Sequence, residues 1–195
     1  MRKTLNDTDT NVYVESLKLL EFGLTQLIKY LTTLDIHIII STFISIITQR
    51  TTSTNIKIQM HSDKFILYLS NVQSIGPMVV VREVFKSISN IIIHEENQQI
   101  NQRKSYGINF FASQQPPPMP QQNTLNFLPI VRFLGILQLL IQQFKNALCY
   151  QREFLNNFTK MAALLWNVFP NKANLKQIIV QVIFLLFFIY ENLDG

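Results

Sequence analysis

The chain has 195 residues, of which 48% are hydrophobic and only 15% are charged, and its formal net charge is +5. A single cysteine excludes an internal disulfide and therefore a disulfide-stabilised secreted domain. The low charge argues against an isolated soluble monomer, because large exposed apolar patches need a partner to cover them.

A leucine stripe runs through residues 11–48, a segment without proline. The stripe predicts an amphipathic helix that packs along its length on another helix inside a bundle. Pairing between copies of the chain in a coiled coil is the alternative, but about three heptads are the minimum signal for it. The members recur at alternating intervals of three and four residues, as in an a/d heptad seam: Leu17, Leu20, Leu24, Leu27, Leu31, Leu34 and Ile38.

The end of this segment, residues 36–47, is a nearly continuous apolar run rich in isoleucine. A membrane-spanning helix needs about 20 such residues, so this run is too short to span a bilayer alone. It is either a buried helix end or a helix end that enters a bilayer, and the sequence leaves both open.

Residues 55–70 favour a small β-hairpin. Ile56, Ile58 and Met60 alternate with polar residues, and residues 65–69 are rich in strand-forming side chains. The polar residues 61–64 between the two runs are typical of a turn. Because an isolated hairpin is only marginally stable in water, we expect it to lie on a helix or against a partner's sheet edge.

A second amphipathic helix is predicted to begin near Pro77, where the missing backbone N–H is not needed. It completes an N-terminal helical region, residues 1–94. Glutamine and proline then dominate residues 95–124, which predicts an extended or disordered linker. The apolar face of the helix consists of Val80, Val81, Val84, Phe85, Ile88, Ile91 and Ile92.

The C-terminal region, residues 125–195, is predicted to be helical and able to enter a membrane. Apolar residues recur at helical spacing from residue 130 to 168, which indicates one long helix or two helices with a break at 150–153. Pro170 ends this stretch. A last helix, residues 175–190, is apolar on all sides from residue 178, so it is buried on all sides or lies in lipid. Residues 178–190 reach about 20 Å, less than a bilayer core of about 30 Å.

The C-terminal half carries almost only positive charge. Between residues 97 and 190 the one acidic side chain is Glu153. Apolar helices with positive charges fit an anionic, partly apolar partner, such as lipid headgroups or another subunit. The residues that we expect to contact lipid or a partner are Arg132, Lys145, Lys176, Phe184, Phe187, Phe188 and Tyr190.

The sequence contains no recognisable catalytic or metal-binding motif. Its three histidines lie in separate segments, and its five glycines occur singly, unlike those of phosphate-binding loops. Cys149 follows a leucine on the long apolar stripe and is predicted to be buried. We therefore expect no enzymatic activity, no cofactor and no catalytic or metal site.

Together these patterns predict a mostly α protein that acts as a non-catalytic accessory subunit of a large membrane-associated complex. The expected partners are other protein subunits and membrane lipid, including anionic lipid, but not nucleic acid. The chain is basic, has one cysteine, and has an amino-acid composition typical of AT-rich coding DNA, which together fit a protein of the mitochondrial inner membrane. The alternatives are a soluble scaffold subunit of a nucleoprotein or other large assembly, and a homo-oligomeric coiled-coil tether.

Overall fold

The computed structural model describes residues 2–5, 7, 9–50, 53–109 and 127–192. It confirms a mostly α fold, and no strand occurs among the described residues. The elements are α1 (Arg2–Leu5), α2 (Thr10–Leu27), the 3-10 turn η1 (Ile28–Tyr30), α3 (Thr33–Arg50), α4 (Ile56–Asn71), α5 (Gly76–Asn109), α6 (Leu128–Gln143), α7 (Lys145–Cys149), α8 (Arg152–Val168) and α9 (Ala173–Glu191).

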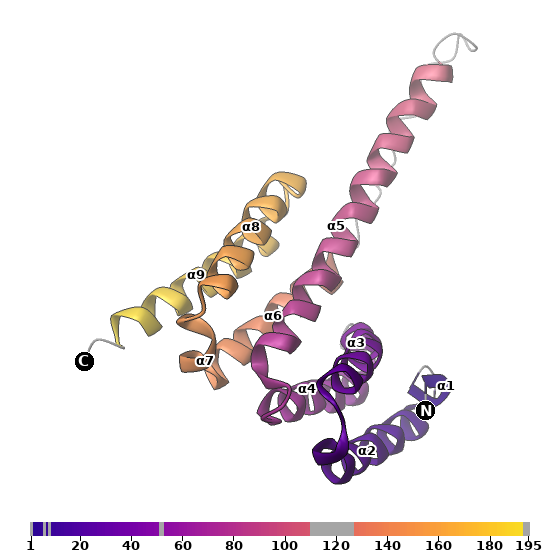
Figure 1. Ribbon diagram of the computed structural model, residues 1–195. Coiled ribbons are helices and arrows are strands. Elements are labelled where there is room, and N and C mark those ends of the chain that lie inside the picture. The colour runs from indigo at the N-terminus through magenta and orange to yellow at the C-terminus, as the bar shows by residue number, and fades with distance from the viewer. Residues whose placement is uncertain (1, 6, 8, 51–52, 110–126, 193–195) are drawn as a thin grey trace.

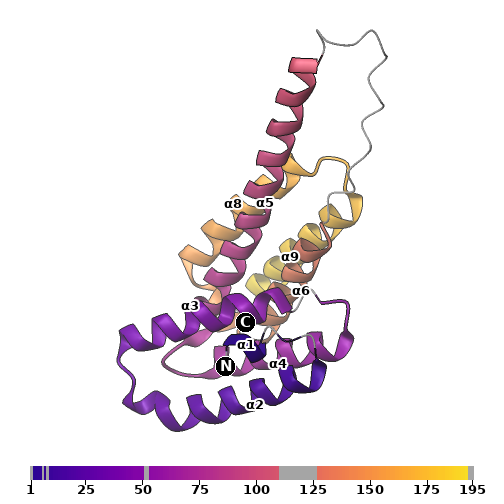
Figure 2. The same ribbon diagram turned by 90° about the vertical axis from the view of Figure 1, so that its right-hand side faces the viewer.

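Helix α5 connects the two halves of the fold. It packs against α3 and α4 on the N-terminal side and against α6, α7 and α8 on the C-terminal side. Helix α9 packs on α6 and α7. The far end of α5 projects beyond the other helices in Figures 1 and 2. One cluster of buried apolar side chains includes residues from α1 through α9, so the same core supports both halves.

The predicted β-hairpin at residues 55–70 is wrong, because this segment is helix α4. Asn55 caps the helix, and its side-chain oxygen accepts hydrogen bonds from the backbone N–H groups of Lys57 and Ile58. The polar residues 61–64 resembled a turn, but they continue the helix, and Ser62 lies on its buried face. That face consists of Ile58, Ser62, Phe65, Ile66, Leu69 and Ser70.

The predicted linker is also wrong over residues 95–109, because α5 continues to Asn109. This stretch contains no proline, and its glutamine, glutamate, lysine and arginine residues are all good helix formers. The remaining linker residues, 110–124, lie outside the described residues. The start of α5 follows the prediction: Gly76 has a φ of 71°, a left-handed conformation that favours glycine, and Pro77 follows in the first turn.

The long helix expected at 11–48 is divided into α2 and α3 by residues 28–32. Leu31 is extended, with φ −85° and ψ 139°. Thr32 and Asp35 then start α3 as a reciprocal cap, since Asp35 N–H donates to Thr32 Oγ1 and Thr32 N–H donates to Asp35 Oδ2. The Thr32 hydroxyl also donates to Asp35 Oδ2, and this bond, together with the one from Thr32 N–H, lowers the pKa of Asp35. The C-terminal stretch breaks at Tyr150 and Gln151, within the range of the two-helix alternative, and again at Phe144.

A buried hydrogen-bonded pair joins α2 to α4. Ser62 Oγ donates to the carbonyl oxygen of Ile58, so the Tyr13 hydroxyl is the donor in its 2.7 Å contact with Ser62 Oγ. Burial raises the pKa of Tyr13 to about 12. The pair therefore stays neutral and fixes the register of the two helices.

Removal of either partner of this pair should destabilise the fold by different amounts. Ser62→Ala leaves the buried Tyr13 hydroxyl without an acceptor and is expected to cost about 1–3 kcal/mol. Tyr13→Phe removes only the bond and should cost about 0.5–1.5 kcal/mol, because Ser62 still donates to Ile58. Urea unfolding followed by circular dichroism measures both, and the reverse order would contradict the assigned donor.

Candidate functional site

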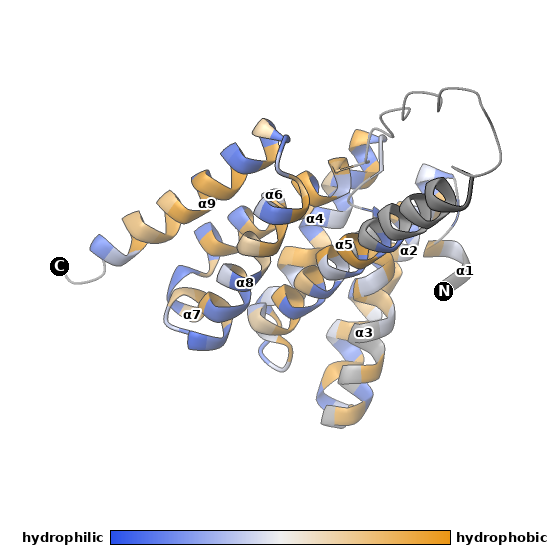
Figure 3. Ribbon diagram, turned by 90° about the horizontal axis from the view of Figure 1, so that it is seen from above, coloured by the Kyte–Doolittle hydropathy of each residue, from blue (hydrophilic) through white to orange (hydrophobic). Residues whose placement is uncertain are grey.

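One face of α9 exposes aromatic side chains to solvent. Phe184, Phe187 and Phe188 are 70%, 64% and 65% exposed. Figure 3 shows that hydrophobic residues cover most of the length of this helix. We call Val180, Ile183, Phe184, Phe187 and Phe188 the α9 surface. The opposite face is buried within the fold and consists of Leu175, Ile179, Val182, Leu186 and Ile189.

Helix α9 is also the only helix among the described residues that is long and apolar enough to cross a membrane. Only 28% of its apolar stretch is buried within the chain. Its 19 residues extend about 28 Å, longer than the apolar run seen in the sequence because the helix begins at Ala173. In the other apolar run, residues 36–47, the side chains of Ile44, Ile46 and Ile47 lie in the core.

A groove lies between α8 and α9 and shares residues with the α9 surface. Its volume is about 560 Å³. Ile183 and Phe187 belong to both the groove and the α9 surface, so the two form one apolar area. The groove is lined by Leu155, Phe158, Thr159, Ala162, Ala163, Trp166, Ile179, Ile183, Leu186, Phe187 and Tyr190.

Two lysines, Lys172 and Lys176, lie where α8 turns into α9, and Lys176 lies beside the end of the groove. Lys176 Nζ is 4.6 Å from the centroid of the Trp166 ring, which lines the groove. Lys172 Nζ is 5.1 Å from the centroid of the Phe127 ring, just before α6. Ammonium groups over aromatic rings are attracted by the ring quadrupole and retain N–H donors for an anion. Lys176, one of the predicted contact residues, thus lies beside the apolar groove.

Glu153, at the start of α8, forms an ion pair with a residue of α5. Arg82 Nε and Nη2 donate to Glu153 Oε1 and Oε2, both over 2.6 Å, in a bidentate ion pair. The hydrogen bonds from Arg82 lower the pKa of Glu153. Glu153 lies in the first turn of α8, at the other end of that helix from Lys172 and Lys176, so it does not offset their positive charge.

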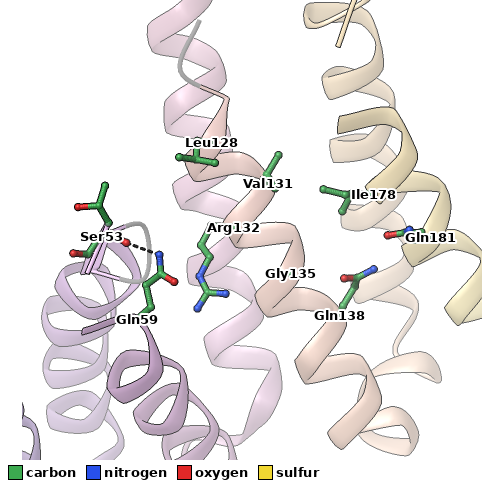
Figure 4. A pocket seen from close by; sticks show the side chains of 10 residues that line it. Ser53, Gln59, Leu128, Val131, Arg132, Gly135, Gln138, Ile178 and Gln181 are labelled. Atoms are coloured by element: carbon green, nitrogen blue, oxygen red, sulfur yellow. Dashed lines mark hydrogen bonds between the residues drawn. The ribbon is translucent and has the colours of Figure 1, made fainter. Parts of the chain in front are cut away.

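Arg132, another predicted contact residue, pairs with Asp63 and joins α6 to α4. Asp63 Oδ1 is buried without a hydrogen-bond partner among the described residues. Desolvation raises the pKa of Asp63, although Arg132 opposes the shift. Figure 4 shows Arg132 in a pocket of about 430 Å³ between α4, α6 and α9, where Gln59 donates to the carbonyl of Ser53. Contact between Arg132 and a partner stays a prediction.

The two remaining predicted contact residues lie apart from each other. Lys145 is exposed at the start of α7. Tyr190 is 39% exposed, and its hydroxyl donates to the Cys149 carbonyl over 2.5 Å, which ties the end of α9 to α7. Contact of either residue with lipid or a partner stays a prediction.

A second exposed apolar surface lies on the N-terminal helices. The predicted leucine stripe divides there: Leu17, Leu20 and Leu24 are buried, and Leu31 is partly buried. The stripe is therefore not one continuous seam in the folded chain. We define the α2–α3 surface by side chains that are at least half exposed: Leu19, Phe22, Leu27, Tyr30, Leu34 and Ile38.

The α2–α3 surface differs from the α9 surface in its charge. Glu15, Glu21 and Asp35 lie on the same two helices, together with Lys18. Lys18 pairs with Glu15 over 2.7 Å. Mixed charge around an apolar patch is typical of a protein interface.

The described residues contain no group of three or more histidine, cysteine or acidic side chains that is able to hold a metal ion. Cys149 is buried, and burial raises the pKa of its thiol, so it is less nucleophilic than a free thiol. No protein-family model, curated protein or solved structure matches the chain.

Proposed function

We propose that the chain is a non-catalytic accessory subunit of a large assembly and that it contacts membrane lipid through the α9 surface. The observation that carries this proposal is the 64–70% exposure of three phenylalanines, Phe184, Phe187 and Phe188, on one helix face. Each phenylalanine side chain gains about 1.5–3 kcal/mol when it is fully removed from water. Covering this surface with lipid or with apolar protein side chains is therefore strongly favourable.

The buried face of α9 determines how the helix meets lipid. Leu175, Val182 and Ile189 hold one side of α9 in the core of the protein. Tyr190 fixes its C-terminal end to α7 through the Cys149 carbonyl. An amphipathic helix held in this way is suited to lie along a membrane with its exposed face in the interface. This arrangement lets α9 meet lipid without leaving the fold.

The rest of the assembly is proposed to cover the α2–α3 surface. Leu19, Phe22 and Leu27 are 61%, 65% and 56% exposed, and acidic and basic groups lie nearby on the same helices. Such a patch favours a protein partner over an anionic bilayer. The basic, low-charge composition is the support for the proposed location at the mitochondrial inner membrane.

Flotation of the purified full chain with phosphatidylcholine vesicles tests the membrane contact. The chain is mixed with vesicles in detergent-free buffer and centrifuged through a density gradient. We expect the chain to rise with the vesicles, because burial of the α9 surface in lipid is favourable. Recovery of a stable, dissolved monomer at the bottom of the gradient would contradict the proposal and favour a soluble assembly.

A further inference from the structure

We propose that the α8–α9 groove binds one acyl chain of an anionic phospholipid, whose phosphate lies beside Lys172 and Lys176. This inference rests on the proposed membrane contact and adds the class of lipid and its position. The groove is continuous with the α9 surface through Ile183 and Phe187. A lipid next to that surface can therefore place a chain in the groove without leaving the membrane.

The lining of the groove suits a hydrocarbon chain because both of its hydroxyl groups are already hydrogen-bonded within the protein. The Thr159 hydroxyl donates to the Leu155 carbonyl over 2.8 Å. The Tyr190 hydroxyl donates to the Cys149 carbonyl. The Trp166 ring lies under the Lys176 ammonium group. From Leu155 to Trp166 the lining extends about 16 Å along α8, long enough for much of an acyl chain.

The charges at the two ends of the groove set the direction of the lipid. At the end near the α8–α9 turn, Lys172 and Lys176 lie over aromatic rings. Arg152, Glu153 and Glu191 lie in the helix turns at the opposite end, where positive and negative charges are mixed. An anionic headgroup is therefore favoured at the lysine end, and the acyl chain extends towards Tyr190.

A phospholipid matches this combination of features better than a helix of a partner protein does. The groove requires an apolar occupant, and the adjacent lysines require negative charge at one end only. One anionic phospholipid supplies both within a single molecule, and the membrane provides it at high local concentration. A partner helix would need an acidic side chain placed at that same end of an otherwise apolar face.

Trp166 provides a direct measurement, because it is the only tryptophan in the chain and it lines the groove. The full chain is bound to phosphatidylcholine vesicles that contain a small fraction of phospholipid with a doxyl-labelled acyl chain. The labelled lipid is either phosphatidylglycerol or phosphatidylcholine at the same mole fraction. We expect labelled phosphatidylglycerol to quench Trp166 fluorescence with an apparent affinity about tenfold higher than that of labelled phosphatidylcholine.

Two charge-matched double variants separate a headgroup site from general attraction. Lys172→Gln with Lys176→Gln should remove the preference for phosphatidylglycerol. Lys64→Gln with Lys160→Gln removes the same charge from exposed positions away from the α8–α9 turn and should keep the preference. Excess unlabelled phosphatidylglycerol should reverse the quenching in the unaltered chain, which gives a result independent of either variant.

Each other outcome has one interpretation. If the chain binds neither kind of vesicle, the proposed function fails and the inference fails with it. If the chain floats but both labels quench Trp166 equally, or both double variants lose the preference, the headgroup site is overturned and the membrane contact stands. If the chain floats and neither label quenches Trp166, the groove excludes lipid, which also overturns the inference and indicates a partner helix.

Discussion

Replacing Phe184, Phe187 and Phe188 together by serine is expected to lower vesicle binding by at least about a hundredfold. A fully exposed phenylalanine gains about 1.5–3 kcal/mol on removal from water, about two thirds of that gain remains for each of these side chains, and a factor of ten in binding corresponds to about 1.4 kcal/mol. The three side chains are 64–70% exposed, so their replacement should leave the folded core intact. The fraction of chain that floats with phosphatidylcholine vesicles, measured over a range of lipid concentrations, gives the change.

A matched variant on the other apolar surface provides the control. Leu19, Phe22 and Leu27 are 61%, 65% and 56% exposed on α2, and their replacement by serine removes a similar exposed apolar area. This second triple variant should bind vesicles as the unaltered chain does, because the α2–α3 surface is proposed to contact protein. Equal losses in the two triple variants would contradict a membrane role specific to α9.

The sequence predicted the first part of α5 correctly, because its apolar period is uninterrupted there. The stripe of α5 from Val80 to Ile92 matches the buried face of that helix. The prediction of a hairpin at α4 was wrong because Ile56 and Met60, which are exposed hydrophobic residues, produce the alternating pattern of a strand. Only the tertiary partner of Ser62, the Tyr13 hydroxyl, shows that this serine belongs to the core.

The candidate site was predictable in part for a similar reason. The cluster at Phe184, Phe187 and Phe188 is visible in the sequence, because too many apolar residues surround α9 for one core to bury. The groove was not predictable, because it forms from two helices whose spacing depends on α5, α6 and α7. Trp166 was a usable signal that was missed, since a tryptophan near the end of an amphipathic helix is suited to a membrane interface.

The sequence also could not show which charges are available to a partner. Arg132 and Lys176 both occur on apolar helices, and nothing local distinguishes them. The fold places Asp63 beside Arg132, whereas Lys176 lies over an aromatic ring at the end of a groove. The difference arises from helix packing between residues distant in the chain.

Phe154→Ala is expected to destabilise the contact between α8 and α5 strongly, with a loss of about 3–5 kcal/mol of folding stability. Phe154 is fully buried at the contact of α8 with α5. Its ring stacks on Phe85 of α5 with a centroid distance of 6.0 Å and on Phe158 with a distance of 6.3 Å. Because whole domains are stable by only about 5–15 kcal/mol, this loss should shift the urea midpoint strongly.

Glu153→Ala, one residue earlier, tests whether aromatic packing or the ion pair holds α8 on α5. Glu153 and Arg82 side chains are 44% and 50% exposed, so solvent screens the pair and its loss should cost about 0.2–1 kcal/mol. The lowered pKa of Glu153 means that this stabilisation is present above the ordinary carboxyl pKa and disappears as the pH falls through the lowered value. Below that pH, Glu153→Ala and the unaltered chain should have equal urea midpoints, whereas the Phe154→Ala deficit should persist. A larger loss from Glu153→Ala at neutral pH would show that the ion pair dominates this contact.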